Sequence, residues 1–345
     1  MEHKRIELLD YMKAVCIIMV IITHYNWSDK SSPFFTMFIN MAVPVFMILS
    51  GYNFSMSNKK RAGGKLSKMY DVHLLESKLE RFLVPFFVIC LVEIVLLLIE
   101  GKHINLFRIF AYGAYGPGSY YVPILIQLIF IFPIIYKLVE KNAKLGLTLA
   151  AVGNLAYEIV VRVSGMEKYY YRLLIGRYIL LIAFGCYLYL HPEQRVKKHQ
   201  MVAMLIIGLS YIYEILWLDR DPVLFEFWTP TAMPIAFYIF PVVVMIFRRF
   251  YHSHIPGALG KGLALLGQAS YHIFLVQMVY YHFELGGILM KLPMVAAISC
   301  NIVICCGVGV LFYEADMYFT GKFKAFWHES MLCRRVYKTG RSGTA

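Results

Sequence analysis

Charged residues are scarce in this sequence: Asp, Glu, Lys and Arg make up 16% of its 345 residues, whereas 59% are hydrophobic. Average soluble chains are about 25% charged and about 45–50% apolar. The longest polar segment, 57–81, is too short for a soluble domain, and no pattern repeats at a fixed period. This composition, with several apolar runs of membrane length, excludes an ordinary soluble protein and predicts a polytopic membrane protein.

Cysteine patterns that would indicate a disulfide framework or a metal site are missing. Six of the seven cysteines lie within apolar runs, and no CxxC motif or Cys/His metal spacing occurs. We therefore expect buried free thiols, no metal and no bound cofactor. Because no further ligands stand at metal spacing, His252, His254 and His272 are interpreted as loop or interface residues.

Acidic residues are fewer than basic ones, 21 against 34, which gives a formal net charge of +13. Such a charge is typical of nucleic-acid-binding proteins, but here the basic residues lie in short loops between apolar segments. Lys and Arg are abundant at both termini and in every second loop, and sparse in the loops between. The positive-inside rule therefore predicts an even number of spans with both termini in the cytoplasm, and no nucleic-acid partner.

Ten apolar segments are long enough to be transmembrane helices. They are 8–27, 34–56, 82–99, 120–137, 145–161, 174–190, 201–218, 230–247, 263–283 and 293–313. The fold class is therefore an all-α polytopic membrane protein with about ten transmembrane helices. We expect one membrane domain over 1–345, with its core at about 4–320 and a basic cytoplasmic tail at 321–345. Apolar residues at helical spacing predict a basic amphipathic helix over 57–81 on the inner surface. The alternative interpretation is that this segment lies beside a nucleotide-bearing donor.

The first apolar segment contains ionisable residues, which cost about 3 kcal/mol each near the centre of a membrane span. Lys13 and His24 are eleven residues apart, which is three turns plus about 20°, so both lie on one helix face, about 16 Å apart. His24 is a candidate proton relay, metal ligand or general base, or else an interfacial histidine. Lys13 is a candidate for binding an anionic donor, or else the partner of Asp10 in an ion pair.

The second segment contains Pro44, which frees backbone groups, and Gly51, which allows a backbone or a ligand to approach closely. Close packing of helices through small residues is the simpler explanation for Gly51.

Seven blocks of sequence occur in a recognisable order: RIELLDYMK, then a histidine ten residues later, VPVFMILSGYNF, KLERFLVPFF, GPGSYYVPILIQLIFIFPII, IGRYILLIAFGCYL, LGQASYHIFLVQ and LFYEAD. In these blocks the chain resembles the membrane acyltransferase 3 family, over about 4–314. Members of that family O- or N-acylate sugars, polysaccharides and other exported or lipid-linked acceptors. They have about ten spans, and in the first span a basic residue precedes a catalytic histidine.

The resemblance implies a donor, an acceptor and a set of site residues. The donor would be cytoplasmic acyl-CoA, as acetyl-CoA or succinyl-CoA, and the acceptor a glycan or lipid-linked sugar at the bacterial cytoplasmic membrane. His24 would act as general base or transient acyl carrier. Lys13 and Arg81 would bind the donor, and Ser50 and Tyr52 would line its thioester entrance. The residues that match family motifs as acceptor-binding or cavity-lining candidates are Tyr121, Arg177, Gln277 and Glu314.

The chain departs from the family pattern at three of these blocks. Lys13 stands where arginine is usual, which keeps the charge but loses the bidentate fork. Tyr120 replaces a tryptophan, and Gln277 replaces a histidine. These differences concern the subfamily and the acceptor more than the chemistry.

Two other classes of function fit a polytopic chain with ionisable residues in its spans. A secondary transporter or lipid flippase would also bury such groups, but no two-half repeat is visible and the polar residues concentrate in the first span. A sensor or scaffold that has lost catalysis is the other alternative. The sequence favours the acyltransferase.

Overall fold

The computed structural model describes residues 6–25, 33–192, 196–218, 220 and 232–340, and for 323–340 the backbone alone. The described part is helical and contains no strand. Its longer helices are α1 (Glu7–His24), α3 (Ala42–Ala62), α5 (Val72–Ile99), α7 (Tyr121–Lys141), α8 (Ala143–Ser164), α10 (Ile179–Leu190), α11 (Lys198–Leu216), α12 (Met233–Phe250), α13 (Gly257–His282) and α14 (Met294–Gly340). The short helices are α2 (Pro33–Met37), α4 (Leu66–Met69), α6 (Leu106–Ala111) and α9 (Lys168–Leu173), with 3-10 turns at η1 (Ile39–Met41), η2 (Ile175–Tyr178) and η3 (Gly287–Lys291).

Eight helices in the described part are long and apolar enough to cross a membrane, so the chain is a multi-pass membrane protein. Two of the predicted spans are not among these eight helices. Helix α1 contains the charged residues Glu7, Asp10 and Lys13, and α10 has only 12 residues because η2 precedes it. The count of ten spans and the cytoplasmic termini stay predictions. Residues 26–27 and 230–231 of the predicted spans lie outside the described residues.

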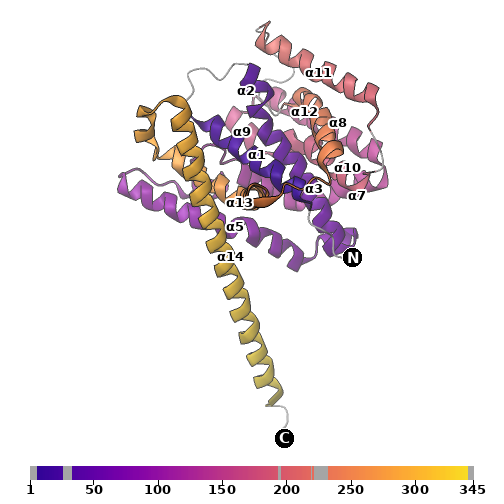
Figure 1. Cartoon of the computed structure of the whole chain (residues 1–345). Helices are drawn as coiled ribbons and strands as arrows, with labels where there is room; N and C mark the ends of the chain where they lie inside the picture. The colour runs from indigo at the N-terminus through magenta and orange to yellow at the C-terminus, as the bar shows by residue number, and fades with distance from the viewer. Residues whose placement is uncertain (1–5, 26–32, 193–195, 219, 221–231, 341–345) are drawn as a thin grey trace.

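The predicted surface helix over 57–81 is wrong, because most of that segment extends two longer helices instead. Helix α3 continues to Ala62 and ends at Gly63, whose φ of 58° is left-handed and suits glycine. Helix α4 is a single turn, and α5 begins after Asp71, whose side chain accepts a hydrogen bond from the backbone N–H of Leu74 at 3.3 Å. At the other end of the chain, residues 321–340 continue α14 as a helix that extends away from the bundle (Figure 1).

Close backbone contact joins α3 to α10, in the middle of the bundle (Figure 1). A Cβ atom added to Gly51 would overlap the carbonyl oxygen of Ile182, and one added to Gly185 would overlap that of Ile48. Glycine therefore lets these two helices touch, as small residues do between membrane helices. The close approach expected at Gly51 is confirmed, and its partner is a helix backbone.

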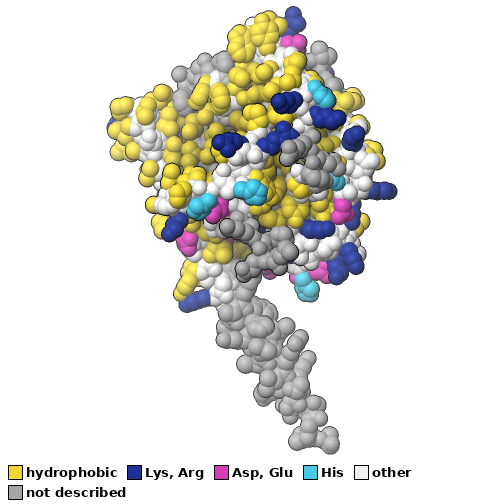
Figure 2. Space-filling model, turned by 45° about the vertical axis from the view of Figure 1, so that its right-hand side comes forward, with side chains coloured by type: hydrophobic (Ala, Val, Ile, Leu, Met, Phe, Trp, Pro, Cys, Tyr) yellow, Lys and Arg dark blue, Asp and Glu magenta, His cyan; other side chains and the backbone are white. Residues whose placement is uncertain are grey.

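Apolar side chains cover much of the outer surface. Figure 2 shows them over most of one face, with Lys and Arg gathered in the middle and right of that view. Large apolar residues are exposed on α5, α8 and α11, with Leu91, Val152 and Ile206 as examples. Soluble monomers rarely expose apolar surface so extensively, and lipid is the environment that suits it.

The contact between α3 and α10 predicts a specific loss of stability. Gly185→Ala should lower the free energy of unfolding by about 1–3 kcal/mol, because the new methyl group forces the two backbones apart. Gly153→Ala in α8 is the matched control, since nothing lies within 4 Å of its Cβ position. Thermal unfolding in detergent should show a lower midpoint for the first variant alone. Equal midpoints for the two variants would contradict this packing.

Candidate functional site

A cavity of about 2260 Å³ lies between α1, α3, α5, α13 and α14, with α7 and α10 also contributing to its wall. Ordinary small-molecule sites measure about 300–1,000 Å³. The cavity is therefore large enough for an extended ligand. We call the end where α1 begins and α3 finishes the inner end, and the end near His24 the outer end.

Lys13 and His24 both line this cavity, as their spacing in the sequence predicts. The Nζ atom of Lys13 lies 2.9 Å from Oδ1 of Asp10, so the ion pair that the sequence offered as an alternative is present. Asp10 is 3% exposed, and its charge is compensated by this contact. Lys13 is thus both a partner of Asp10 and a wall residue of the cavity.

His24 is the last residue of α1 and is partly exposed. Its ring lies 6.1 Å from the ring of Tyr281 in α13. The Tyr281 hydroxyl donates a hydrogen bond to the backbone carbonyl of Ile21 at 3.0 Å, which joins α13 to the last turns of α1. These contacts hold the histidine at the outer end of the cavity.

The remaining donor-binding candidates, which come from α3 and α5, also line the cavity. Ser50 of α3 shares a hydrogen bond with the hydroxyl of Tyr121 at the start of α7. The hydroxyl groups of Tyr52 and Tyr251 lie 3.2 Å apart. Arg81 of α5 faces the inner part of the cavity. The structure therefore brings together Lys13, Ser50, Tyr52, Arg81, Tyr121 and His24.

Basic side chains cluster at the inner end. Lys59, Lys60 and Arg61 come from the last turn of α3, and Lys78 and Arg81 come from the first turns of α5. A concave surface lined by one sign of charge raises the local concentration of ligands of the opposite sign. This end of the cavity suits a polyanion.

Three of the family-matched residues do not line the cavity. Arg177 is buried beneath the ring of Tyr171, with its guanidinium 4.7 Å from the ring centre. Gln277 is buried and donates a hydrogen bond to the carbonyl of Pro117 at 3.3 Å, while Glu314 is exposed on α14. We expected these three residues and Tyr121 at the acceptor or in the cavity wall, and of the four only Tyr121 lines the cavity.

One buried pair of ionisable residues in the cavity wall was not predicted from the sequence. His272, interpreted there as a loop or interface residue, lies inside α13 and is 6% exposed. Its Nε2 atom lies 3.0 Å from Oδ2 of Asp316 in α14, and both residues line the cavity. The available signal was an ionisable residue in an apolar helix, but Asp316 lies 44 residues further on, beyond the segment predicted to span the membrane.

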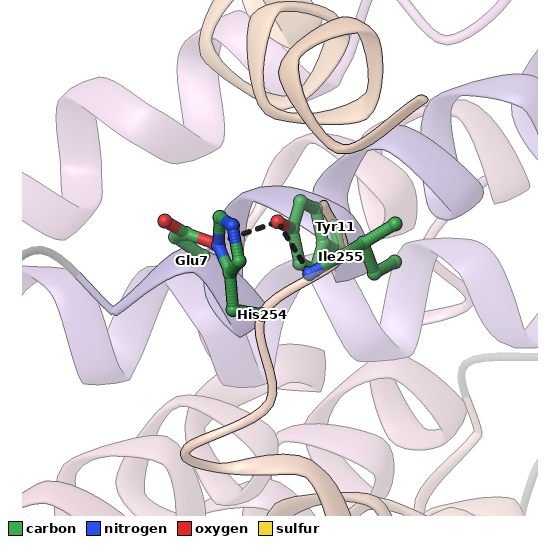
Figure 3. A network of polar contacts seen from close by, with 4 residues as sticks. All are labelled: Glu7, Tyr11, His254 and Ile255. Atoms are coloured by element: carbon green, nitrogen blue, oxygen red, sulfur yellow. Dashed lines mark hydrogen bonds and ion pairs between the residues drawn. The ribbon is translucent and has the colours of Figure 1, made fainter. Parts of the chain in front are cut away.

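His254 lies in the loop between α12 and α13, as expected, and connects that loop to α1 (Figure 3). Its Nδ1 atom lies 2.6 Å from Oε2 of Glu7, which also accepts a hydrogen bond from the Tyr11 hydroxyl at 2.7 Å. The backbone N–H of Ile255 donates to the same hydroxyl at 3.4 Å. This network fixes the first turn of α1 relative to the start of α13.

Comparison with known proteins identifies the family. The family model for the acyltransferase domain of acyltransferase family 3 matches residues 6–314. The chain belongs to this family. No curated protein and no solved structure matches the chain. The resemblance noted in the sequence is confirmed, and the protein is a membrane acyltransferase.

The matched region of this acyltransferase includes most of the cavity wall, from Ile6 to Tyr313. Asp316 lies just beyond its end. Among the described residues, no three His, Cys, Asp or Glu side chains form a group that could hold a metal ion.

Water access to the cavity is directly measurable by thiol labelling. Ser50→Cys should react with a water-soluble maleimide at least about tenfold faster than Ile48→Cys, because reaction requires an accessible thiolate. Both residues lie in α3, but Ser50 lines the cavity and Ile48 is 0% exposed. Labelling is counted above that of the wild-type protein. Equal rates at the two positions would show that the cavity is closed to solvent.

Proposed function

We propose that this acyltransferase moves an acyl group, acetyl or succinyl, from cytoplasmic acyl-CoA to a hydroxyl or amine of a cell-surface or lipid-linked glycan. The site is at the bacterial cytoplasmic membrane. The observation that supports this is the single cavity that contains a basic inner end, Lys13 and, at its outer end, His24. The family match supplies the reaction class.

The inner end suits the charged part of acyl-CoA. Lys59, Lys60 and Arg61 would meet the phosphates, because ammonium and guanidinium groups donate charge-assisted hydrogen bonds to phosphate oxygens. The long arm of the donor would then extend past Lys13 toward His24. The two residues are about 16 Å apart along the axis of α1, so a long, thin donor suits the cavity better than a compact one.

His24 would act as the general base. The acceptor hydroxyl loses its proton to the imidazole as its oxygen bonds to the thioester carbonyl carbon. The carbon–sulfur bond then breaks, and the departing thiolate takes up the proton. An imidazole suits both proton steps near neutral pH, and such catalysis contributes about 10²–10⁴-fold. Direct attack of the imidazole on the thioester, followed by transfer to the acceptor, is the other use of the same residue.

The acceptor would enter at the outer end, and aromatic residues form part of the cavity wall further in. Tyr121 lies 5.1 Å from Phe274 and 6.4 Å from Phe46, measured between ring centres, and Tyr120 is adjacent. Aromatic rings offer large apolar faces with polar edges, which suits a sugar ring with its apolar face and hydroxyl groups.

Thioester consumption by purified protein in lipid tests this proposal. His24→Ala should lower kcat for loss of acetyl-CoA by about 100-fold or more, because the general base is removed. His103→Ala is the control, since His103 is exposed and does not line the cavity. Wild-type activity in His24→Ala would refute the role of His24, and movement of a glycan without loss of thioester would indicate a transporter.

Lys13 can be tested in the same assay by a conservative pair of variants. Lys13→Met should raise KM for acetyl-CoA about tenfold, since one charge-assisted contact of about 1.5–3 kcal/mol is lost. Lys13→Arg keeps the charge and should remain within a few-fold of the wild-type KM. If the two variants change KM equally, the charge at this position does not bind the donor.

A further inference from the structure

A second imidazole lies in the cavity wall, in addition to that of His24. The Nε2 atom of His272 contacts Asp316, whose other carboxylate oxygen accepts a hydrogen bond from Thr320 at 3.3 Å. An ionised carboxylate only accepts hydrogen bonds, so Nε2 holds a proton. In the neutral imidazole the other nitrogen, Nδ1, then has a lone pair that accepts.

The Nδ1 atom of His272 has no hydrogen-bond partner among the described residues. The rings of Phe312 and Tyr313 pack beside the imidazole, with centres 5.0 and 5.3 Å away. Buried acceptors in proteins nearly always have a donor from protein, water or ligand. The Nδ1 atom itself has almost no exposed surface, so a ligand in the cavity would reach it by displacing the ring of Phe312 or Tyr313, and both of these residues also line the cavity.

The position of His272 along the cavity follows from the packing of α1 against α13. The two helices run in the same direction, since Gly267 touches the carbonyl of Asp10 and the ring of Tyr281 lies 6.1 Å from that of His24. At about 1.5 Å per residue, His272 lies roughly 8 Å beyond this Gly267 contact, and His24 lies roughly 21 Å beyond it. His272 is therefore about 13 Å nearer to the inner end than His24.

Arg81 adds a donor to the same part of the cavity. It lines the wall, and it lies close enough to His272 for its charge to act on the imidazole. A guanidinium group only donates hydrogen bonds, whereas Nδ1 accepts one. Together they complement an amide, whose carbonyl accepts and whose N–H donates. Phosphate and thioester groups have no N–H to offer.

We propose that His272, held by Asp316, binds an amide of the donor's pantetheine arm. This inference rests on the proposed function, in which acyl-CoA is the donor and its thioester lies at His24. The arm contains two amides between the phosphates and the sulfur. The amide nearer the sulfur is only a few bonds from it, so the distance of about 13 Å assigns His272 to the farther amide. His272 then recognises the donor and takes no part in bond breaking.

Two donors of different length test this assignment in the thioester assay. Acetyl-CoA contains both amides, whereas the acetyl thioester of N-acetylcysteamine contains only the nearer one. His272→Gln keeps an N–H toward Asp316 and removes the ring acceptor. It should raise KM for acetyl-CoA about tenfold with kcat within about twofold, as expected for one lost hydrogen bond. KM for the short thioester should not change.

Tyr280→Phe is the matched control, because Tyr280 makes another hydrogen bond between α13 and α14. Its hydroxyl donates to Oδ1 of Asn301 at 2.6 Å, and it does not line the cavity. This variant should keep the wild-type KM for both donors. If His272→Gln does not fold, Asp316→Asn replaces it: the new amide can donate to Nε2, which moves the imidazole proton to Nδ1 and removes the same acceptor.

The outcomes separate this inference from the proposed function. An unchanged KM for acetyl-CoA, an equal rise for both donors, or a fall in kcat without a change in KM would overturn the role of His272 alone. If wild-type protein consumes neither thioester, the proposed function has failed, and binding decides the inference. Weaker binding of coenzyme A by His272→Gln, with unchanged binding of adenosine 3′,5′-bisphosphate, would support it, and any other binding result would refute it.

Discussion

The packing of α1 against α13 determines where Lys13, His24 and His272 lie relative to one another along the cavity. Gly267 allows the backbone of α13 to touch the carbonyl of Asp10, and a side chain at that position would push the two helices apart. The network of Glu7, Tyr11 and His254 fixes the same pair of helices at one end (Figure 3). Contacts of Tyr281 fix them at the other. With the two helices held in this register, one face of α1 is available to the cavity along its whole length.

That arrangement explains how charged residues are tolerated in a membrane bundle. An ionisable group facing lipid would be costly, whereas one in the wall of an interior cavity can contact water, a partner side chain or a ligand. The partner of Lys13 is the carboxylate of Asp10, and the partner of His272 is the carboxylate of Asp316. The outer surface is apolar in turn, so the protein separates a lipid-facing exterior from an interior cavity that joins a basic inner end to His24.

Local periodicity predicted the features that depend on one helix alone. The spacing of Lys13 and His24 placed them on one face, and both line the cavity. Features that depend on two helices were not accessible in this way. His272 is an isolated histidine in an apolar run, and only packing brings Asp316 to it. Similarly, Glu314 belongs to a family motif, but the rotation of α14 turns it outward and directs Asp316 into the cavity wall.

The prediction of membrane spans was likewise successful for some features of the helices and not for others. Hydropathy found the long apolar helices, but α1 and α10 do not satisfy length and composition in the structure, one because of its charges and the other because a 3-10 turn shortens it. The segment 57–81 had helical spacing throughout, yet Gly63 and the Asp71 cap divide it between two helices. Periodicity detects helices more reliably than it detects their ends.

An experimental structure with an unreactive thioether analogue of acetyl-CoA would test the central claim most directly, namely that one cavity joins a cytoplasmic donor to His24. We predict the phosphates beside Lys59 and Arg61, the arm along α1, and the acyl carbon next to the place where His24 would hold the attacking hydroxyl of the acceptor. An analogue bound outside the cavity, or one whose acyl end lies more than about one helical turn (5.4 Å) from the His24 ring, would contradict this account.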